Sequence, residues 1–203
     1  MEQPQVTKQE TEEIIHLSNK ILLDLVEGDF VEFGCYKGDT SVLLHEAIVK
    51  YKKAHGRRPS NFPLLWLYDS FSGLPPKTSE DVSAAGDQFK AGELFVSKRE
   101  VVERLKKLGF QRDFIIKGFF EELDAASDLP ASISFAFLDG DFYSSIKTSL
   151  ELVVPKLSRG GIIVVHDYNN PELPGSSRAV DEFLKSRPEF KLIQKYTLAI
   201  LTR

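Results

Sequence analysis

The stretch that decides the fold is Glu32-Phe-Gly-Cys-Tyr-Lys-Gly-Asp-Thr-Ser41. Residues 30–33, which lead into it, are typical of a short buried strand. Its last three residues begin a helix, because short oxygen-bearing side chains cap free backbone N–H groups and apolar positions recur after them. The stretch therefore predicts a strand, a glycine turn and a helix in direct succession.

The same alternation continues along the chain. Further strands are expected over 64–68, 114–117, 134–138 and 162–165, with helices over 9–25, 98–108, 144–157 and 178–185 and a short helix near 121. Repeated strand–helix units predict a mostly parallel, doubly wound α/β sheet of the Rossmann-like kind, with helices on both faces. The last two apolar runs, 190–194 and 198–201, are separated by a short turn and predict an antiparallel C-terminal hairpin.

Length and composition favour one folded domain over residues 1–203, with an N-terminal helix within 1–29 and a long active-site loop over 72–94. The chain has 203 residues, 42% hydrophobic and 28% charged, and no apolar run that would cross a bilayer. A net charge of −4 without a basic stripe argues against nucleic acid as a partner. The single cysteine, Cys35, and the lack of a leader-like start predict a cytoplasmic protein.

The residues around the glycine turn discriminate between cofactors. A dinucleotide pyrophosphate requires Gly-x-Gly-x-x-Gly, which is absent here. Glu32 and Asp39 would repel phosphate and favour a cationic ligand, and S-adenosylmethionine carries an ammonium and a sulfonium. Taken alone, Gly34 and Gly38 are equally consistent with an ordinary turn between a strand and a helix that binds no ligand.

An acid also ends the second strand, in Leu67-Tyr-Asp69. At such a position a carboxylate can accept hydrogen bonds from a ribose diol, as it does in nicotinamide-cofactor folds. The alternative is that Asp69 is a surface cap.

Four ionisable residues follow two later strands, in Phe137-Leu-Asp-Gly-Asp141 and Val164-Val-His-Asp167. If these strands are neighbours, their tips bring Asp139, Asp141, His166 and Asp167 together, and a divalent cation would offset the repulsion. Mg²⁺ suits the carboxylates, whereas the imidazole of His166 suits a transition metal or general-base work. The alternative is that the acids cap helices and His166 is structural.

Four motifs together resemble the macrocin-type (TylF-like) O-methyltransferases. They are the glycine turn over 32–41, Tyr68-Asp-Ser-Phe-Ser-Gly-Leu-Pro75, Leu138-Asp-Gly-Asp-Phe-Tyr-Ser-Ser145 and Gly160-Gly-Ile-Ile-Val-Val-His-Asp-Tyr168. The resemblance runs from about residue 31 to residue 183 and implies a class I methyltransferase fold. It also implies methyl transfer from S-adenosylmethionine to a hydroxyl of a small-molecule acceptor, such as a natural-product sugar, assisted by Mg²⁺ or another divalent metal.

The resemblance assigns roles by position. It makes Asp139 the candidate general base and Asp141 and Asp167 metal ligands, and it places Glu32, Gly34, Gly38, Asp69 and Ser70 around the cofactor. We add His166 as a second candidate base and a third candidate ligand. The full set of residues that we expect around the cofactor is Glu32, Gly34, Tyr36, Gly38, Thr40, Ser41, Asp69, Ser70, Phe71, Gly118, Phe119 and Asp139.

Two departures from the family pattern keep alternatives open. Metal-using members carry aspartate where this chain has His166, so methylation without a metal, with His166 as the base, is one alternative. Only about thirty residues precede the first strand, so we expect an open site or one completed by a second subunit in a homo-oligomer. A cofactor-binding partner protein without catalytic activity is the alternative outside enzymes.

Overall fold

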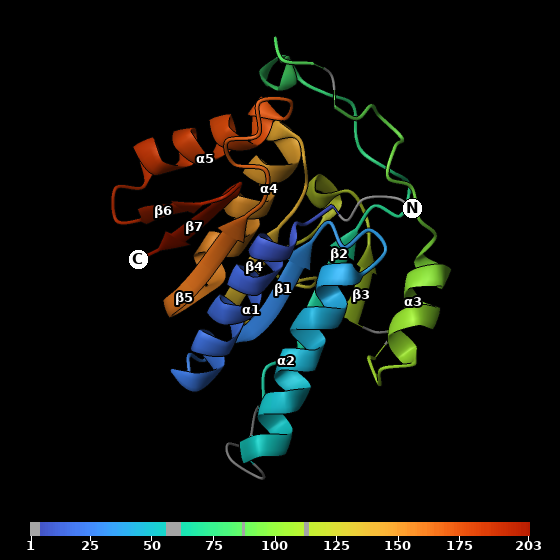
Figure 1. The fold of residues 1–203 in the computed structure, drawn as a ribbon, viewed down its shortest axis with the longest axis vertical. Coiled ribbons are helices and arrows are strands. Elements are labelled where there is room, and N and C mark those ends of the chain that lie inside the picture. Colours follow the sequence, from blue (N-terminus) through green and yellow to red (C-terminus); the bar gives the residue numbers. More distant parts are fainter. Residues whose placement is uncertain (1–4, 56–61, 87, 112–113) are drawn as a thin grey trace.

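One sheet forms the centre of the molecule (Figure 1). The computed structural model describes residues 5–55, 62–86, 88–111 and 114–203. Across these ranges the sheet has seven strands in the order β3-β2-β1-β4-β5-β7-β6, and only β7 runs antiparallel to both of its neighbours. The strands are β1 Asp29–Phe33, β2 Leu65–Asp69, β3 Ile115–Lys117, β4 Ile133–Leu138, β5 Leu157–Val165, β6 Lys191–Lys195 and β7 Leu198–Thr202. The predicted mostly parallel sheet with a C-terminal hairpin is confirmed.

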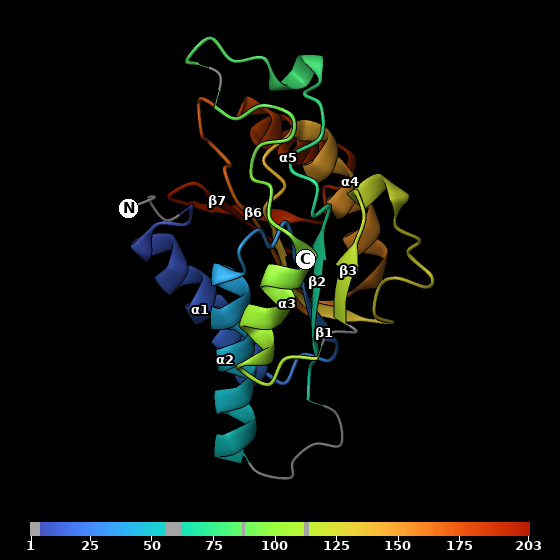
Figure 2. The same cartoon turned by 90° about the vertical axis from the view of Figure 1, so that its right-hand side faces the viewer.

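Helices cover both faces of the sheet, with α1, α2 and α3 on one side and α4 and α5 on the other (Figure 2). Their bounds are α1 Lys8–Leu23, α2 Asp39–His55, α3 Lys98–Lys106, α4 Tyr143–Val153 and α5 Pro174–Ser186, with single 3₁₀ turns at η1 Ser79–Asp81, η3 Phe120–Glu122 and η4 Val154–Lys156. The alternation along the strands explains the two layers. In β1, Phe30 packs against the α1–α3 layer, whereas Val31 and Phe33 pack against the α4–α5 layer.

Several element boundaries differ from the prediction. β5 begins at Leu157 because an irregularity in its pairing with β4 accommodates extra residues before the apolar run over 162–165. α5 begins at Pro174, since proline is tolerated in the first turn of a helix. The loop over 72–94 contains η1 and is not without secondary structure. Residues 1–4 of the predicted N-terminal segment and residue 87 of this loop lie outside the described residues.

The strand order reverses at β1, which lies between β2 and β4. In open α/β sheets, ligands bind beyond the carboxyl ends of the strands at such a switch point. The glycine turn after β1 and the acidic motifs after β4 and β5 all lie at this edge. Among the described residues, no helix combines the length and apolar character needed to cross a membrane.

Candidate active site

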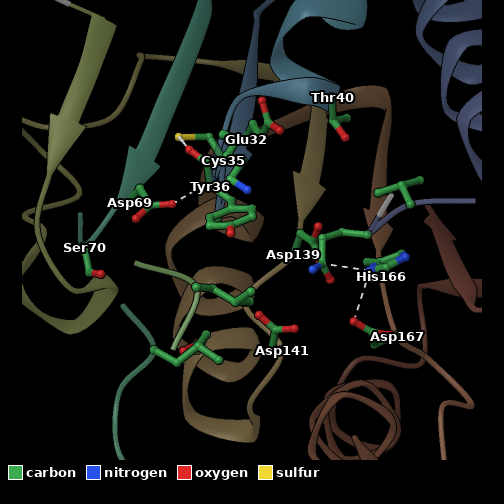
Figure 3. A pocket seen from close by; sticks show the side chains of 18 of the residues that line it. Glu32, Cys35, Tyr36, Thr40, Asp69, Ser70, Asp139, Asp141, His166 and Asp167 are labelled. Atoms are coloured by element: carbon green, nitrogen blue, oxygen red, sulfur yellow. Dashed lines mark hydrogen bonds and ion pairs between the residues drawn. The ribbon is translucent and has the colours of Figure 1, made fainter. Parts of the chain in front are cut away.

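A pocket opens at the carboxyl ends of β1, β2, β4 and β5 (Figure 3). Residues from all the sequence motifs line it, together with the start of the chain and both ends of the loop over 72–94. The predicted site residues that line the pocket are Glu32, Gly34, Tyr36, Thr40, Asp69, Ser70, Phe119, Asp139, Asp141, His166 and Asp167.

Four residues that were predicted to contact a cofactor do not line the pocket: Gly38, Ser41, Phe71 and Gly118. Phe71 is buried in the core of the α1–α3 layer, and Ser41 is fully buried in the first turn of α2. The amide of Gly38 donates to the Cys35 carbonyl at 2.7 Å, and that of Gly118 donates to the Asp69 carbonyl at 3.0 Å. These residues shape the turns that carry the lining residues, and their contact with the cofactor stays a prediction.

Glu32, near the end of β1, is 1% exposed and still lines the pocket. Its Oε2 atom has no hydrogen-bond partner among the described residues. Burial raises the pKa of Glu32 well above its ordinary value; the nearby Ser41 hydroxyl offsets part of the rise, and the Asp139 and Asp69 carboxylates add to it. A buried carboxylate oxygen without a donor is costly, so this position is prepared for a ligand that brings a donor or a positive charge.

Gly34 allows the β1 and β4 tips to approach each other. Its φ is +86°, and a Cβ at this position would lie 1.9 Å from the backbone carbonyl oxygen of Asp139. Its own amide donates to the Tyr68 carbonyl at 2.8 Å. Only glycine fits here, for reasons of both conformation and space.

Asp69, at the end of β2, is held by two backbone amides. Its Oδ2 accepts from the Tyr36 amide at 2.9 Å, and its Oδ1 accepts from the Phe71 amide at 2.8 Å. Burial raises the pKa of Asp69, and the two amides offset part of the rise. The carboxylate is therefore fixed in orientation at the pocket wall. Ser70 also lines the pocket, but its hydroxyl donates to the Gly73 carbonyl at 2.7 Å, which gives it a role in shaping the loop.

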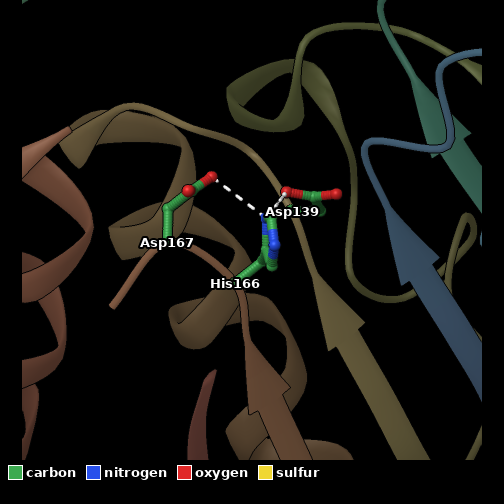
Figure 4. A group of neighbouring side chains, drawn as sticks. All are labelled: Asp139, His166 and Asp167. Atoms are coloured by element: carbon green, nitrogen blue, oxygen red, sulfur yellow. Dashed lines mark hydrogen bonds and ion pairs between the residues drawn. The ribbon is translucent and has the colours of Figure 1, made fainter. Parts of the chain in front are cut away.

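Asp139, His166 and Asp167 form a compact group (Figure 4). The Nδ1 atom of His166 lies 2.9 Å from Asp139 Oδ1 and 3.0 Å from Asp167 Oδ2. One ligand atom from each of the three residues falls within 4.8 Å of the others. Burial by itself lowers the pKa of His166, but the two carboxylates outweigh it and hold the pKa well above its ordinary value. The arrangement suits a shared cation, either a proton on the ring or a metal ion.

The position of Asp141 differs from the prediction that this residue joins His166 and Asp167 as a metal ligand. It lies outside the compact group, and Asp139, predicted as a base, takes its place. Asp141 lines the pocket at 7% exposure, and its carboxylate accepts no hydrogen bond from any described residue. Burial raises its pKa well above the ordinary value, and the carboxylates of Asp139 and Asp167 add to the rise.

Sequence reasoning missed Glu10, a residue of α1. It is 1% exposed, and its Oε2 atom lies 3.7 Å from Nε2 of His166. It also accepts from the Thr7 amide at 2.9 Å and from the Thr197 amide at 3.2 Å. The pattern Thr7-x-x-Glu10 signals a helix-capping box, but no local signal indicates a contact with a residue 156 positions later.

The loop over 72–94 contributes to the pocket through Gly73, Leu74, Pro75 and Leu94. Its middle part is attached to the α4–α5 layer. Asp81 accepts from the Tyr143 amide at 2.7 Å, and Ser83 donates to the Pro171 carbonyl at 2.6 Å.

Comparison with known proteins identifies the family of this chain. The family model of macrocin O-methyltransferase (TylF) matches residues 5–194. The 8-demethyl-8-(2,3-dimethoxy-alpha-L-rhamnosyl)-tetracenomycin-C 4'-O-methyltransferase of Streptomyces olivaceus is 30% identical over 155 residues, which are 73% of this chain and 56% of that protein. The demethyldecarbamoylnovobiocin O-methyltransferase of Streptomyces niveus is 30% identical over 165 residues, 78% of this chain and 58% of that protein. The chain thus spans a little over half the length of these two relatives.

The solved structure of the O-methyltransferase NovP has the same fold. It superposes with a TM-score of 0.76 at 24% sequence identity, covering 95% of this chain and 78% of NovP. The sheet order, the hairpin and the two helical layers are those of class I methyltransferases. With its family model matched over nearly the whole length, the chain belongs to the macrocin O-methyltransferase (TylF) family.

Proposed function

We propose that this protein transfers the methyl group of S-adenosylmethionine to a hydroxyl of a small-molecule acceptor, with a sugar attached to a natural product as the acceptor class. The single observation that carries the proposal is the pocket itself, where acids from four strand ends surround one space in a chain of this family. The names of the two Streptomyces relatives, one of which specifies a rhamnosyl group, support the acceptor class.

Two acids near the strand ends receive the cofactor in this proposal. The unpaired Oε2 atom of Glu32 accepts from the ammonium group of the methionine part. Asp69, already fixed by two backbone amides, accepts from the ribose hydroxyls. Gly34 lets the β1 and β4 tips pack closely, which brings Glu32 and Asp139 to the same end of the pocket.

Asp141 is the proposed acceptor of the hydroxyl proton. Its side chain lines the pocket and lies outside the compact group of Asp139, His166 and Asp167, so it is available to accept a proton. Asp139, the base expected from the sequence, instead lies against the His166 ring. We therefore exchange the roles that the sequence suggested for these two aspartates.

Asp139, His166 and Asp167 would hold a divalent metal ion, since their donor atoms are close enough to share one ion. When bound, such an ion lowers the pKa of a coordinated hydroxyl and so eases its deprotonation. The buried neighbour Asp141 adds negative charge that favours a cation in this part of the pocket. The identity of the ion is treated in the next subsection.

Methylation without a metal, with His166 as the base, receives less support. Nδ1 of the ring faces Asp139 and Asp167, and Nε2 faces Glu10, so neither nitrogen is directed at an acceptor. A cofactor-binding partner protein without catalytic activity would not need Asp141 beside the compact group.

We keep a cytoplasmic location in the proposal because Cys35, the chain's single cysteine, is buried and free. A homo-oligomer that completes the open side of the pocket also remains part of it.

The first test is calorimetric titration of S-adenosylmethionine and S-adenosylhomocysteine into the purified protein. We expect micromolar binding of both, and weaker binding to Glu32→Gln. Release of S-adenosylhomocysteine is then followed with a panel of rhamnosylated and other glycosylated acceptors. Absence of binding would overturn the cofactor assignment, whereas binding without product from any acceptor would favour the partner-protein alternative.

A further inference from the structure

The compact group of Asp139, His166 and Asp167 has an unusual donor set for a magnesium site. Two carboxylates and one imidazole nitrogen converge, with Nδ1 of His166 at 2.9 Å from Asp139 Oδ1 and 3.0 Å from Asp167 Oδ2. Mg²⁺ prefers oxygen ligands, whereas imidazole binds first-row transition metals well. We propose that this group binds a first-row transition-metal dication such as Mn²⁺ or Co²⁺ in preference to Mg²⁺, and that Glu10 is the residue that positions the His166 ring for it.

The evidence for the role of Glu10 is the orientation of the His166 ring. With Nδ1 directed at the two carboxylates, the other nitrogen, Nε2, lies 3.7 Å from Glu10 Oε2. Histidines that bind metals nearly always present their second ring nitrogen to a carboxylate or carbonyl, which fixes the tautomer and the ring angle. Glu10 places a carboxylate beside this nitrogen from α1, a helix distant in sequence from both acidic motifs. The separation is that of an ion pair and is longer than a hydrogen bond.

Glu10 is itself held firmly in place. Oε2 accepts from the amide and the hydroxyl of Thr7 at 2.9 and 2.6 Å, and Oε1 accepts from the amide and the hydroxyl of Thr197. The carboxylate therefore joins the start of α1, the turn between β6 and β7 and the end of β5. A residue fixed in this way can hold the imidazole in one orientation, as a metal ligand requires.

A separate observation points to a cation at this place. Asp141 is 7% exposed and lines the same pocket, within range of the charges of Asp139 and Asp167. Three carboxylates close together at one pocket wall repel each other, and a bound cation offsets that repulsion. The proposal thus rests on the three converging donor atoms and on the further carboxylate of Asp141 beside them.

This inference rests on the metal part of the proposed function, and it is tested without cofactor or acceptor so that the two can fail independently. Mn²⁺ binding to the metal-free wild-type protein is measured by the loss of the free-ion EPR signal, with Mg²⁺ as competitor. We expect one Mn²⁺ per chain, displaced only by a large molar excess of Mg²⁺. Co²⁺ is expected to give a visible absorption band that reports on the imidazole ligand.

Two variants separate the parts of the proposal. Glu10→Gln should weaken Mn²⁺ binding about 10- to 100-fold, the usual effect of removing an outer carboxylate, and should alter the Co²⁺ spectrum. Glu12→Gln is the matched control, because it changes an exposed glutamate of the same helix and leaves Glu10 and its partners in place. His166→Asp should reduce the preference for Mn²⁺ over Mg²⁺.

Three results would overturn the proposal. Absence of Mn²⁺ binding to the wild-type protein would reject the site, even if S-adenosylmethionine still binds. Equal competition by Mg²⁺ would reject the selectivity. A Glu12→Gln variant as defective in Mn²⁺ binding and as changed in Co²⁺ spectrum as Glu10→Gln would show that the effect is not specific to Glu10. If Glu10→Gln does not fold, the wild-type Co²⁺ spectrum and the His166→Asp competition still decide the donor set.

Discussion

Glu10 Oε2 lies 3.7 Å from His166 Nε2, at the ring nitrogen that does not face Asp139 and Asp167. Burial alone would raise the pKa of Glu10, but its interactions with His166 and with two threonines outweigh this and hold the pKa well below its ordinary value. The first helix is thereby connected to the acidic end of β5. This connection has consequences for stability as well as for the site.

Stability at acid pH should depend on Glu10. Because its pKa is lower in the folded protein than its ordinary value of 4.5, the stabilisation is present above about that pH and is lost as the pH falls further. Glu10→Gln should reduce the free energy of unfolding at pH 7 by about 1.5–3 kcal/mol and by less at pH 3. Urea unfolding at both pH values measures this. An equal loss at both would show that the carboxylate charge is not responsible.

Glu32→Gln should change stability and binding in opposite directions. The buried carboxylate has an unpaired oxygen and a raised pKa, so its ionised form is unfavourable in the free protein. We expect an equal or higher melting temperature but an affinity for S-adenosylmethionine that is lower by about 10- to 100-fold, the loss of one charged hydrogen bond. Glu27→Gln, at an exposed position, is the control. Unchanged affinity in Glu32→Gln would exclude the carboxylate from the cofactor site.

Asparagine substitutions of Asp139 and Asp141, the two aspartates that follow β4, should affect metal binding and turnover differently. Asp139→Asn should lose most of its Mn²⁺ affinity, because Asp139 is a member of the converging group. Asp141→Asn should retain S-adenosylmethionine and Mn²⁺ binding while turnover falls by about 10²-fold or more, the usual contribution of a general base. EPR titration and product formation distinguish the two. Full turnover by Asp141→Asn would return the role of base to another residue.

Gly34 should be far less tolerant of alanine than Gly92, although both have a positive φ. A Cβ on Gly34 would lie 1.9 Å from the Asp139 carbonyl oxygen, whereas a Cβ on Gly92 would have no atom within 4 Å. Gly92→Ala should cost only about 1–2 kcal/mol for the left-handed backbone. Gly34→Ala should cost clearly more in chemical denaturation and should weaken cofactor binding. Similar costs for the two variants would contradict the close approach of β1 and β4.

Asp81 should control the attachment of the loop over 72–94. Its Oδ1 accepts from the Tyr143 amide at the start of α4, and Oδ2 accepts from the amide of Thr78 at 2.8 Å. Asp81→Ala removes these bonds, so local opening should be favoured by about 1–3 kcal/mol. Trypsin cleavage at Lys77 and Lys90 should then be at least about five-fold faster, with unchanged cleavage elsewhere. Ser79→Ala, in the same turn, is the control, and equal cleavage of both variants would argue against Asp81.

Much of the fold follows from local pattern. The turn from Glu32 to Ser41 and the repeated strand–helix units predict the parallel sheet, and the two closing apolar runs predict the hairpin, because each depends on neighbouring residues. The same motifs predict that Asp69, Asp139 and Asp167 lie at one edge, since the carboxyl ends of parallel strands meet there. The boundaries of β5 and α5 were less well predicted, because pairing irregularities and tertiary packing set them.

The amino-acid sequence by itself determined the layered α/β architecture and the set of acids at its functional edge. Only the tertiary structure decided which acids are grouped, because that depends on distances of a few ångströms between loops. It placed Asp139 beside His166 and left Asp141 apart, although the two aspartates are two residues from each other in the chain. It also brought Glu10 from α1 to the His166 ring, a contact between helix and strand that no periodicity or motif encodes.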